Sequence, residues 1–249
     1  MAEAAAVTED RLLDGRVTLR QPASGFRAAI DPVLLAAAVP ANDGDTVLDL
    51  GTGTGAAALC LAARVPGCRV VGLERSTEAF ALATENVDLN GLADRLAMVL
   101  GDVLRPPPRL APSSFDHVMA NPPHLSAGKA APSPDAGRAA AAVEGEAALG
   151  DWIKTGLMML REGGSLTMIH RADRLDEILV LCRGRAGDAH VVPLWPKADG
   201  RPAKRVILRC RKGNAAPLKL TPGVVLHEAD GRYTAAAEAI LRDGAALVP

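Results

Sequence analysis

Aromatic residues are scarce in this chain. Three Phe, two Trp and one Tyr make up 2% of its 249 residues. Proteins that bind several bases of a single-stranded nucleic acid stack them on successive aromatic rings. The composition therefore excludes a surface that stacks several bases.

Cysteine and histidine are also few and scattered. The four cysteines form no CxxC pair, and the five histidines show no HxxxH spacing. Scattered cysteines in a chain of this length are typical of free thiols in a cytosolic protein. We therefore expect a cytoplasmic protein without a metal site. The cysteines are Cys60, Cys68, Cys182 and Cys210.

Neither sign of charge dominates, and long apolar runs are missing. The chain has 28 Lys and Arg against 29 Asp and Glu, a formal net charge of −1. This balance disfavours attachment to nucleic acid or membrane by overall charge. No apolar run reaches the roughly 18 residues that a membrane-spanning helix needs. Residues 1–11 also lack the basic start and apolar stretch of a secretory signal.

From residue 46 onward, short apolar runs alternate with segments of helical pattern. This alternation predicts βαβ units and a mostly parallel sheet with helices on both faces. Only a loop separates the last two strands, so we expect them to pair antiparallel. The predicted fold class is α/β: a Rossmann-like, doubly wound, mostly parallel seven-stranded sheet with a terminal antiparallel strand. The expected strands are 46–50, 68–74, 95–102, 115–120, 165–170, 189–194 and 205–211, and the expected helices are 54–65, 77–90, 148–161 and 172–183.

The segments outside this pattern predict three parts. Residues 1–40 should form a hairpin and a helix packed on a core domain, and Asp31-Pro32 has the cap-and-proline pattern of a helix start. The core domain is expected over residues 41–213. Residues 214–249 should form an extension, with a small helix at 234–242, packed on the same domain. Residues 125–147 are long for a connection and suggest either an active-site lid or disorder.

The sharpest local signal is Asp49-Leu50-Gly51-Thr52-Gly53-Thr54-Gly55, directly after the first core strand. Glycines at alternate positions allow a tight turn and let backbone N–H groups approach a ligand. With Ala56 the run also fits a loose dinucleotide fingerprint, which leaves NAD and S-adenosylmethionine (SAM) both open. The third glycine and Asp49, which can face a ligand ammonium group, favour SAM.

Acidic residues follow the next two strands. Glu74 ends the second strand and can accept hydrogen bonds from two ribose hydroxyls. Asp102, in Gly101-Asp102-Val103, can accept one from an adenine amino group. A solvated strand end for Glu74 and a helix cap for Asp102 are the structural alternatives. Because such groups occur at three successive strand ends, a nucleotide-binding crevice is the better interpretation.

Asn121-Pro122-Pro123-His124 follows the fourth strand. Two prolines after an asparagine form at least a rigid turn. They can also form a stiff site in which the Asn121 Oδ1 and the Pro122 carbonyl accept both hydrogens of a planar NH₂ group. Holding both N–H groups biases that amine toward the pyramidal geometry of a methyl acceptor. The chemistry then depends on positioning and electrostatics, without a strong general base.

Together these motifs resemble the class I SAM-dependent amino methyltransferases. Residues 25–39, 170–179 and 201–209 resemble, more narrowly, the bacterial tRNA(Val) N6-adenine methyltransferase family, and the similarity extends over roughly residues 11–245. The resemblance implies SAM as cofactor, a methyltransferase domain at 41–213, and N6 of an adenine in tRNA as the acceptor. A protein glutamine amide, a guanine amino group, and a SAM- or RNA-binding protein without turnover remain alternatives.

The resemblance also implies a set of site residues, with one departure. His124 stands where the family usually has an aromatic residue that stacks on the flipped base, a contact of roughly 1–3 kcal/mol. Imidazole offers less stacking area, so either the acceptor differs or the stacking comes from elsewhere. The expected catalytic residues are Asn121, Pro122, Pro123 and His124. The expected cofactor-binding residues are Asp49, Gly51, Thr52, Gly53, Gly55, Glu74, Arg75, Asp102 and Val103.

Residues 197–219 are rich in Lys and Arg, with Asp199 as their only acid. This local asymmetry suits RNA phosphates, whereas a charged edge strand would explain it structurally. We expect Lys204 and Arg205 to contact the substrate. Phe26 and Arg27 could line the acceptor pocket, while Asp31 is expected to act as a helix cap.

Overall fold

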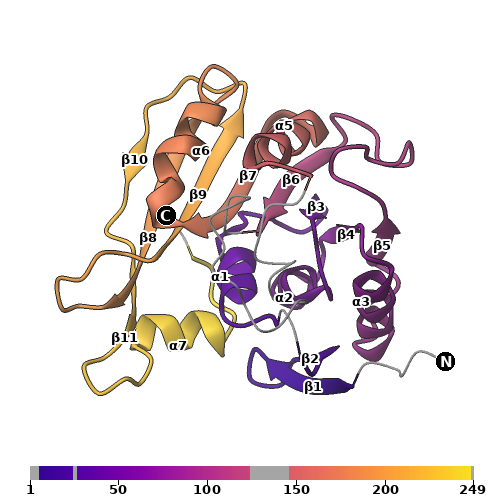
Figure 1. Cartoon of the computed structure of the whole chain (residues 1–249), viewed down its shortest axis with the longest axis horizontal. Coiled ribbons are helices and arrows are strands. Elements are labelled where there is room, and N and C mark those ends of the chain that lie inside the picture. Colours follow the sequence, from indigo (N-terminus) through magenta and orange to yellow (C-terminus); the bar gives the residue numbers. More distant parts are fainter. Residues whose placement is uncertain (1–5, 25–26, 124–145, 248–249) are drawn as a thin grey trace.

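The computed structural model describes residues 6–24, 27–123 and 146–247 (Figure 1). Within them, nine strands form one sheet, which lies between two layers of helices. The strands are β3 (Thr46–Leu50), β4 (Arg69–Glu74), β5 (Leu96–Leu100), β6 (Phe115–Ala120), β7 (Leu160–Arg171), β8 (Ala186–Lys197), β9 (Arg205–Lys212), β10 (Lys219–Leu220) and β11 (Val224–His227).

The strand order is β10-β8-β9-β7-β6-β3-β4-β5, with β11 also paired to β8. Strands β3 to β7 pair in parallel, whereas β9 pairs antiparallel with both β7 and β8. The predicted α/β class and the antiparallel pairing of the last two core strands are confirmed. The sheet also has two strands more than the seven predicted. These are the short β10 and β11, which the C-terminal segment adds in parallel to β8.

The helices begin and end within a few residues of the predicted bounds. Ser76 caps the helix that begins at Thr77, since its hydroxyl accepts a hydrogen bond from the Ala79 N–H. The predicted helix 172–183 begins as a short 3-10 turn at Ala172–Arg174. The helices are α1 (Asp31–Ala38), α2 (Ala56–Arg64), α3 (Thr77–Leu89), α5 (Leu149–Met159), α6 (Leu175–Cys182) and α7 (Ala235–Leu241).

The prediction for Asp31 was wrong. Ile30 occupies the N-cap position of α1, and Asp31 is the first helical residue. Its carboxylate pairs instead with the Arg205 guanidinium, with 3.0 Å between Oδ2 and Nε. A long-range cation therefore takes the place of the local cap that the sequence pattern indicated.

Two apolar clusters fill the two faces of the sheet. One joins α1, α2 and α7 with the N-terminal hairpin, and the other lies under α5 and α6 (Figure 1). Neighbouring residues of β6 show the alternation, since Val118 enters the second cluster and Met119 the first. All four cysteines are buried free thiols, as predicted.

The strand order places a topological switch point between β3 and β6. The chain moves from β3 outward to β4 and β5, then returns to the other side of β3 as β6. In open α/β sheets, ligands bind beyond the carboxyl ends of the strands at such a point. Leu50 of β3 lies opposite Ala120 of β6, so the residues that follow these two strands emerge side by side.

A hairpin of β1 (Val7–Leu12) and β2 (Val17–Pro22) packs on α3 and is bonded to it through two side-chain amides. Asn86 accepts from the Arg20 N–H at 2.7 Å and donates to the Arg20 carbonyl at 2.8 Å. Asn90, one turn later, makes the same pair of bonds with Thr18. Asn86 also donates to the Thr54 carbonyl at 2.9 Å, so it links the hairpin to the glycine-rich loop.

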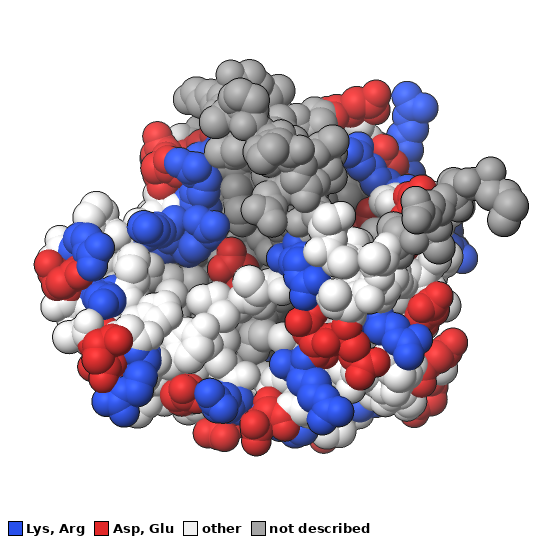
Figure 2. All heavy atoms as spheres, turned by 60° about the horizontal axis from the view of Figure 1, so that its bottom comes forward, with Lys and Arg blue, Asp and Glu red and all other residues white. Residues whose placement is uncertain are grey.

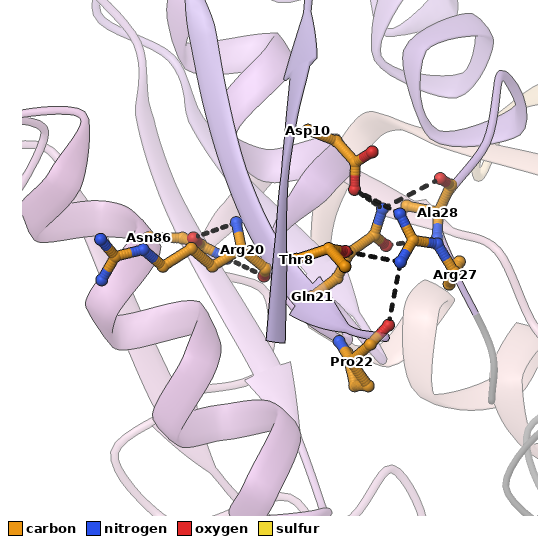
Figure 3. A network of polar contacts seen from close by, with 8 residues as sticks. All are labelled: Thr8, Asp10, Arg20, Gln21, Pro22, Arg27, Ala28 and Asn86. Carbon is orange, nitrogen blue, oxygen red and sulfur yellow. Dashed lines mark hydrogen bonds and ion pairs between the residues drawn. The ribbon is translucent and has the colours of Figure 1, made fainter. Parts of the chain in front are cut away.

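The chain after the hairpin is held back onto it by Arg27 and Gln21. Figure 3 shows the Arg27 guanidinium bonded to the Asp10 carboxylate, the Thr8 hydroxyl and the Pro22 carbonyl. The Gln21 amide bonds to the main chain of Ala28. These contacts fix the course of the segment that leads into α1.

Within the described residues, no helix is long and apolar enough to cross a membrane.

We predict that Asn86→Ala lowers the free energy of unfolding by about 2–3 kcal/mol, because it removes a buried amide and leaves main-chain groups of Arg20 and Thr54 without its hydrogen bonds. Urea denaturation measures the loss. Glu85→Ala changes the exposed neighbour in the same helix and should stay within about 0.5 kcal/mol of the wild type. Equal stability of the two variants would contradict the linking role of Asn86.

Candidate functional site

A cavity of about 440 Å³ opens at the carboxyl ends of β3, β4, β5 and β6. Its walls come from these strand ends, from the segment after the hairpin and from α5. Most of the residues predicted from the sequence line it together: Asp49, Gly51, Thr52, Gly53, Glu74, Arg75, Asp102, Val103, Asn121 and Pro123.

Some predicted positions lie elsewhere. Gly55 and Pro122 are not among the lining residues, although each adjoins residues that are. Gly55 is the N-cap of α2 and has φ of +89°, so it ends the loop rather than facing a ligand. The predictions for Phe26, His124 and most of the segment 125–147 fall outside the described residues.

The glycine-rich loop has the tight course that its sequence predicts. Gly51 and Gly53 adopt φ of +67° and +59°, a region that residues with a Cβ rarely enter. At Gly51 space is also limiting, because a Cβ there would lie 2.4 Å from the Cη2 atom of Trp152. The loop therefore depends on glycine for both its conformation and its packing.

Glu74 is held in place by three backbone donors. Its Oε2 accepts from the Gly53 N–H at 2.9 Å, and its Oε1 accepts from the N–H groups of Arg75 and Ser76. The first of these bonds joins the β4 end to the glycine-rich loop. A carboxylate oriented in this way keeps lone pairs free for ligand hydroxyls. The solvated strand end considered above therefore does not describe Glu74.

Asp49 is a buried carboxyl group, with 2% of its surface exposed. Its Oδ2 accepts from the Thr52 hydroxyl at 2.6 Å. Its pKa is raised to about 7, mainly by burial; the Thr52 hydrogen bond opposes this rise, and the charge of Glu74 adds to it. A cationic group bound beside it would favour the ionised form.

Asp102 and Val103 form the wall beyond β5. The Asp102 Oδ1 accepts from the Leu104 N–H at 2.9 Å, which closes a local turn. Val103 is buried, and its carbonyl accepts from the Thr155 hydroxyl of α5. The Asp102 carboxylate thus closes a turn, and the residue also lies in the cavity wall.

Asn121 and Pro123 line the cavity directly after β6. The Asn121 Oδ1 is shielded from water and has no hydrogen-bond partner among the described residues. Buried polar atoms normally have partners, so an orphaned acceptor in a cavity wall indicates a ligand donor. This agrees with the predicted role of Asn121 in holding an amine.

Sequence reasoning missed two side chains that support these motifs. His170, at the end of β7, is fully buried, and its Nε2 lies 3.3 Å from the Pro123 carbonyl. Because a carbonyl only accepts, the imidazole donates and fastens the Asn-Pro-Pro turn to β7. Trp152 of α5 covers Gly51. A signal for Trp152 was present, since it is one of two tryptophans in the chain.

The N-terminal segment supplies one wall of the cavity, through Pro22, Ser24, Ala28 and Pro32. From the sequence, Phe26 and Arg27 could line the pocket. Arg27 is not among the lining residues and bonds to the hairpin instead. The segment was therefore implicated correctly, whereas Arg27 holds it in place.

The basic stretch 197–219 is largely neutralised by nearby acids. Arg205 pairs with Asp31 and lies outside the cavity wall, whereas Lys204 is exposed at the start of β9. Figure 2 shows positive and negative side chains interspersed over the face in view. Further ion pairs in or next to the stretch join Arg201 to Asp199, Arg211 and Lys219 to Asp188, and Lys212 to Glu162.

The lining residues fit SAM. The glycine-rich turn lets a ligand come close to backbone N–H groups. The Asp49 carboxyl group can pair with the ammonium group of SAM, and Glu74 can accept hydrogen bonds from its ribose hydroxyls. The orphaned Asn121 Oδ1 suits an amine acceptor beside it. In the described part of the chain, no three His, Cys, Asp or Glu side chains are grouped as metal ligands.

Comparisons with known proteins agree with this fold. Residues 28–176 match one family, the methyltransferase small domain. A tRNA1(Val) (adenine(37)-N6)-methyltransferase of Actinobacillus pleuropneumoniae is 30% identical over 207 residues, which cover 83% of this chain and 84% of the relative. A release factor glutamine methyltransferase of Chlorobaculum tepidum is 36% identical over 93 residues, 37% of this chain and 32% of the relative.

The fold is also seen in solved structures. The crystal structure of a predicted O-methyltransferase from Agrobacterium tumefaciens superposes with a TM-score of 0.73 at 27% identity. It covers 88% of this chain and 99% of that one.

The fold and site define a class I methyltransferase. The chain belongs to the methyltransferase small domain family. The predictions of a methyltransferase, of its family and of SAM as cofactor are confirmed.

We predict that affinity for S-adenosylhomocysteine rises about tenfold between about pH 6 and pH 8, as Asp49, with its pKa raised to about 7, ionises to pair with the ligand ammonium. Isothermal titration calorimetry across this range measures the change. Asp49→Asn should bind more weakly and with little pH dependence. No histidine is among the described lining residues, so a pH dependence that persists in this variant would contradict the assignment.

Proposed function

We propose that this protein is a SAM-dependent N-methyltransferase that methylates an exocyclic amino group of RNA, N6 of an adenine in tRNA. The orphaned Asn121 Oδ1 in the cavity wall carries the proposal. The relatives named as tRNA1(Val) methyltransferases support the substrate, because their similarity covers more than four-fifths of the chain.

When bound, SAM supplies an electrophilic methyl group, which the amine lone pair attacks as the S–C bond pair returns to sulfur. Asn121 and the Pro122 carbonyl hold the two amine hydrogens and direct the lone pair at that methyl. The His170 bond to Pro123 keeps this turn rigid. Because the amine becomes acidic only after transfer, its proton can leave to water. The step therefore depends on preorganised positions rather than on a strong base.

A protein glutamine amide is the second candidate acceptor. The matching glutamine methyltransferase relative supports it, since an amide also offers a planar NH₂ group. That similarity covers 37% of this chain, whereas the similarity to the tRNA enzymes covers more than four-fifths of it. The adenine proposal therefore has the wider support.

We propose further that the segments 1–40, 41–213 and 214–249 act as one catalytic unit in the cytoplasm. Leu19, Leu59 and Ile240, one from each segment, belong to the same buried apolar cluster. Shared burial of this kind supports joint folding of the three segments.

We predict that Asn121→Ala lowers the rate of methyl transfer by about 10²–10³-fold, because it removes a preorganised contact to the amine. Affinity for S-adenosylhomocysteine should stay within about twofold of the wild type. Transfer from radiolabelled SAM and calorimetry measure the two quantities. Undiminished transfer by the variant would contradict the proposed acceptor site.

The acceptor itself is identified by incubation with labelled SAM and separate pools of tRNA, rRNA and protein extract. Nuclease or protease digestion and mass spectrometry then locate the methyl group. N6-methyladenine in the tRNA pool is the expected product. Methylglutamine in the protein pool would instead favour the second candidate.

We predict that Lys204→Ala weakens tRNA binding and makes the log–log dependence of affinity on salt about one unit shallower, because an exposed cation at this edge contacts phosphate. Filter binding at several salt concentrations measures the slope. Lys219→Ala, which changes an exposed lysine of the outer strand β10, should leave the slope unchanged. Equal slopes for all three proteins would remove Lys204 from the RNA surface.

A further inference from the structure

The side chain that covers the glycine-rich loop also has an unused hydrogen-bond donor. Trp152 lines the cavity and is 9% exposed. Its indole N–H is shielded from water and has no partner among the described residues. The other tryptophan, Trp195, donates to the Pro222 carbonyl at 2.9 Å. Of the two tryptophans, Trp152 is therefore the one whose indole N–H is left to bond to a ligand.

Trp152, which bears this donor, and Asn121, which bears the unused acceptor, line the same cavity. The Trp152 ring packs on Gly51, the residue after β3, and Asn121 is the residue after β6. Leu50 and Ala120, the last residues of the two strands, lie opposite each other in the parallel ladder. Trp152 and Asn121 therefore line the cavity at two neighbouring strand ends.

The Trp152 N–H is a buried donor and the Asn121 Oδ1 a buried acceptor, and neither has a partner among the described residues. A ligand that satisfies both must present an acceptor to Trp152 and a donor to Asn121. The Watson–Crick edge of adenine provides it, since the N6 amino group donates and the adjacent N1 accepts. On the same edge of guanine the amino group is followed by an N1–H donor, which would leave the indole N–H facing another donor. Enzymes that flip a base read this edge by hydrogen bonds.

We propose that Trp152 is a specificity residue, whose indole N–H donates to N1 of the target adenine while Asn121 holds the N6 amine. The inference rests on the proposed function, because it requires an adenine in the cavity. It assigns to Trp152 the rejection of guanine, since an unpaired buried donor costs more than a missing contact on the surface.

The test combines Trp152→Phe with atom substitutions in the RNA. The probe is an anticodon stem-loop that carries the methylated adenosine, with 1-deazaadenosine or 7-deazaadenosine at that position. For the wild type, loss of N1 should lower kcat/KM about tenfold more than loss of N7. In Trp152→Phe this difference should vanish, because a smaller aromatic ring without an N–H replaces the indole. An equal difference in both proteins would overturn the proposal.

Stability and cofactor binding separate this role from a structural one. Trp152→Phe removes a donor that has no protein partner, so the free energy of unfolding should fall no further than in Trp195→Phe, which breaks a hydrogen bond. Because Trp152 also packs on Gly51, any fall in affinity for S-adenosylhomocysteine should affect the 1-deaza and 7-deaza stem-loops equally. A selective loss of that affinity, with the N1 dependence intact, would assign the N–H to the cofactor and overturn the proposal.

Fluorescence offers a second measurement that leaves Trp152 in place. In the Trp195→Phe background Trp152 is the sole tryptophan. Its emission should change when the unmodified stem-loop binds in the presence of S-adenosylhomocysteine, and should change less with the 1-deaza stem-loop. An identical response to both would overturn the proposal. If the wild type methylates no adenosine in any RNA, the proposed function fails, which differs from methylation that is indifferent to N1.

Discussion

Parallel pairing of β3 with both β4 and β6 is the constraint on which the site depends. The ladder sets Leu50 opposite Leu73 on one side and Ala120 on the other. The residues that follow these strands therefore emerge together, although more than forty positions separate Glu74 from Asn121. The Gly53 bond to Glu74 then joins two of the strand ends directly. With a different register between these strands, the same motifs would be present but too far apart to contact one ligand.

The site also depends on two side-chain amides of α3 that form the hydrogen bonds a backbone would form. Asn86 and Asn90 bond to the edge of β2 as a neighbouring strand would, and Asn86 continues to the Thr54 carbonyl. A side-chain amide provides one donor group and one acceptor, so it satisfies both groups of a residue on an exposed strand edge. These bonds join the hairpin to the glycine-rich loop. The segment that follows the hairpin forms one wall of the cavity.

The charged side chains form local ion pairs rather than a large surface of one sign. The basic stretch proves to be interleaved with acids, as with Arg201 and Asp199 or Arg205 and Asp31. Such pairs leave few cations for RNA phosphates, and exposed Lys204 is the clearest of them. At the site, burial raises the pKa of Asp49, and a cationic ligand bound beside it would favour the ionised form. Recognition therefore depends on a few atoms in the cavity.

The sequence by itself determined the α/β class, the glycine-rich turn, the acids after β4 and β5, and the Asn-Pro-Pro motif. Each depends on periodicity or local chemistry, which neighbouring residues encode. Only the tertiary structure decided that Asp31 pairs with Arg205, that β10 and β11 extend the sheet, and that His170 and Trp152 support the site. Those contacts join residues far apart in the chain, and no local pattern specifies which distant partner a side chain will meet.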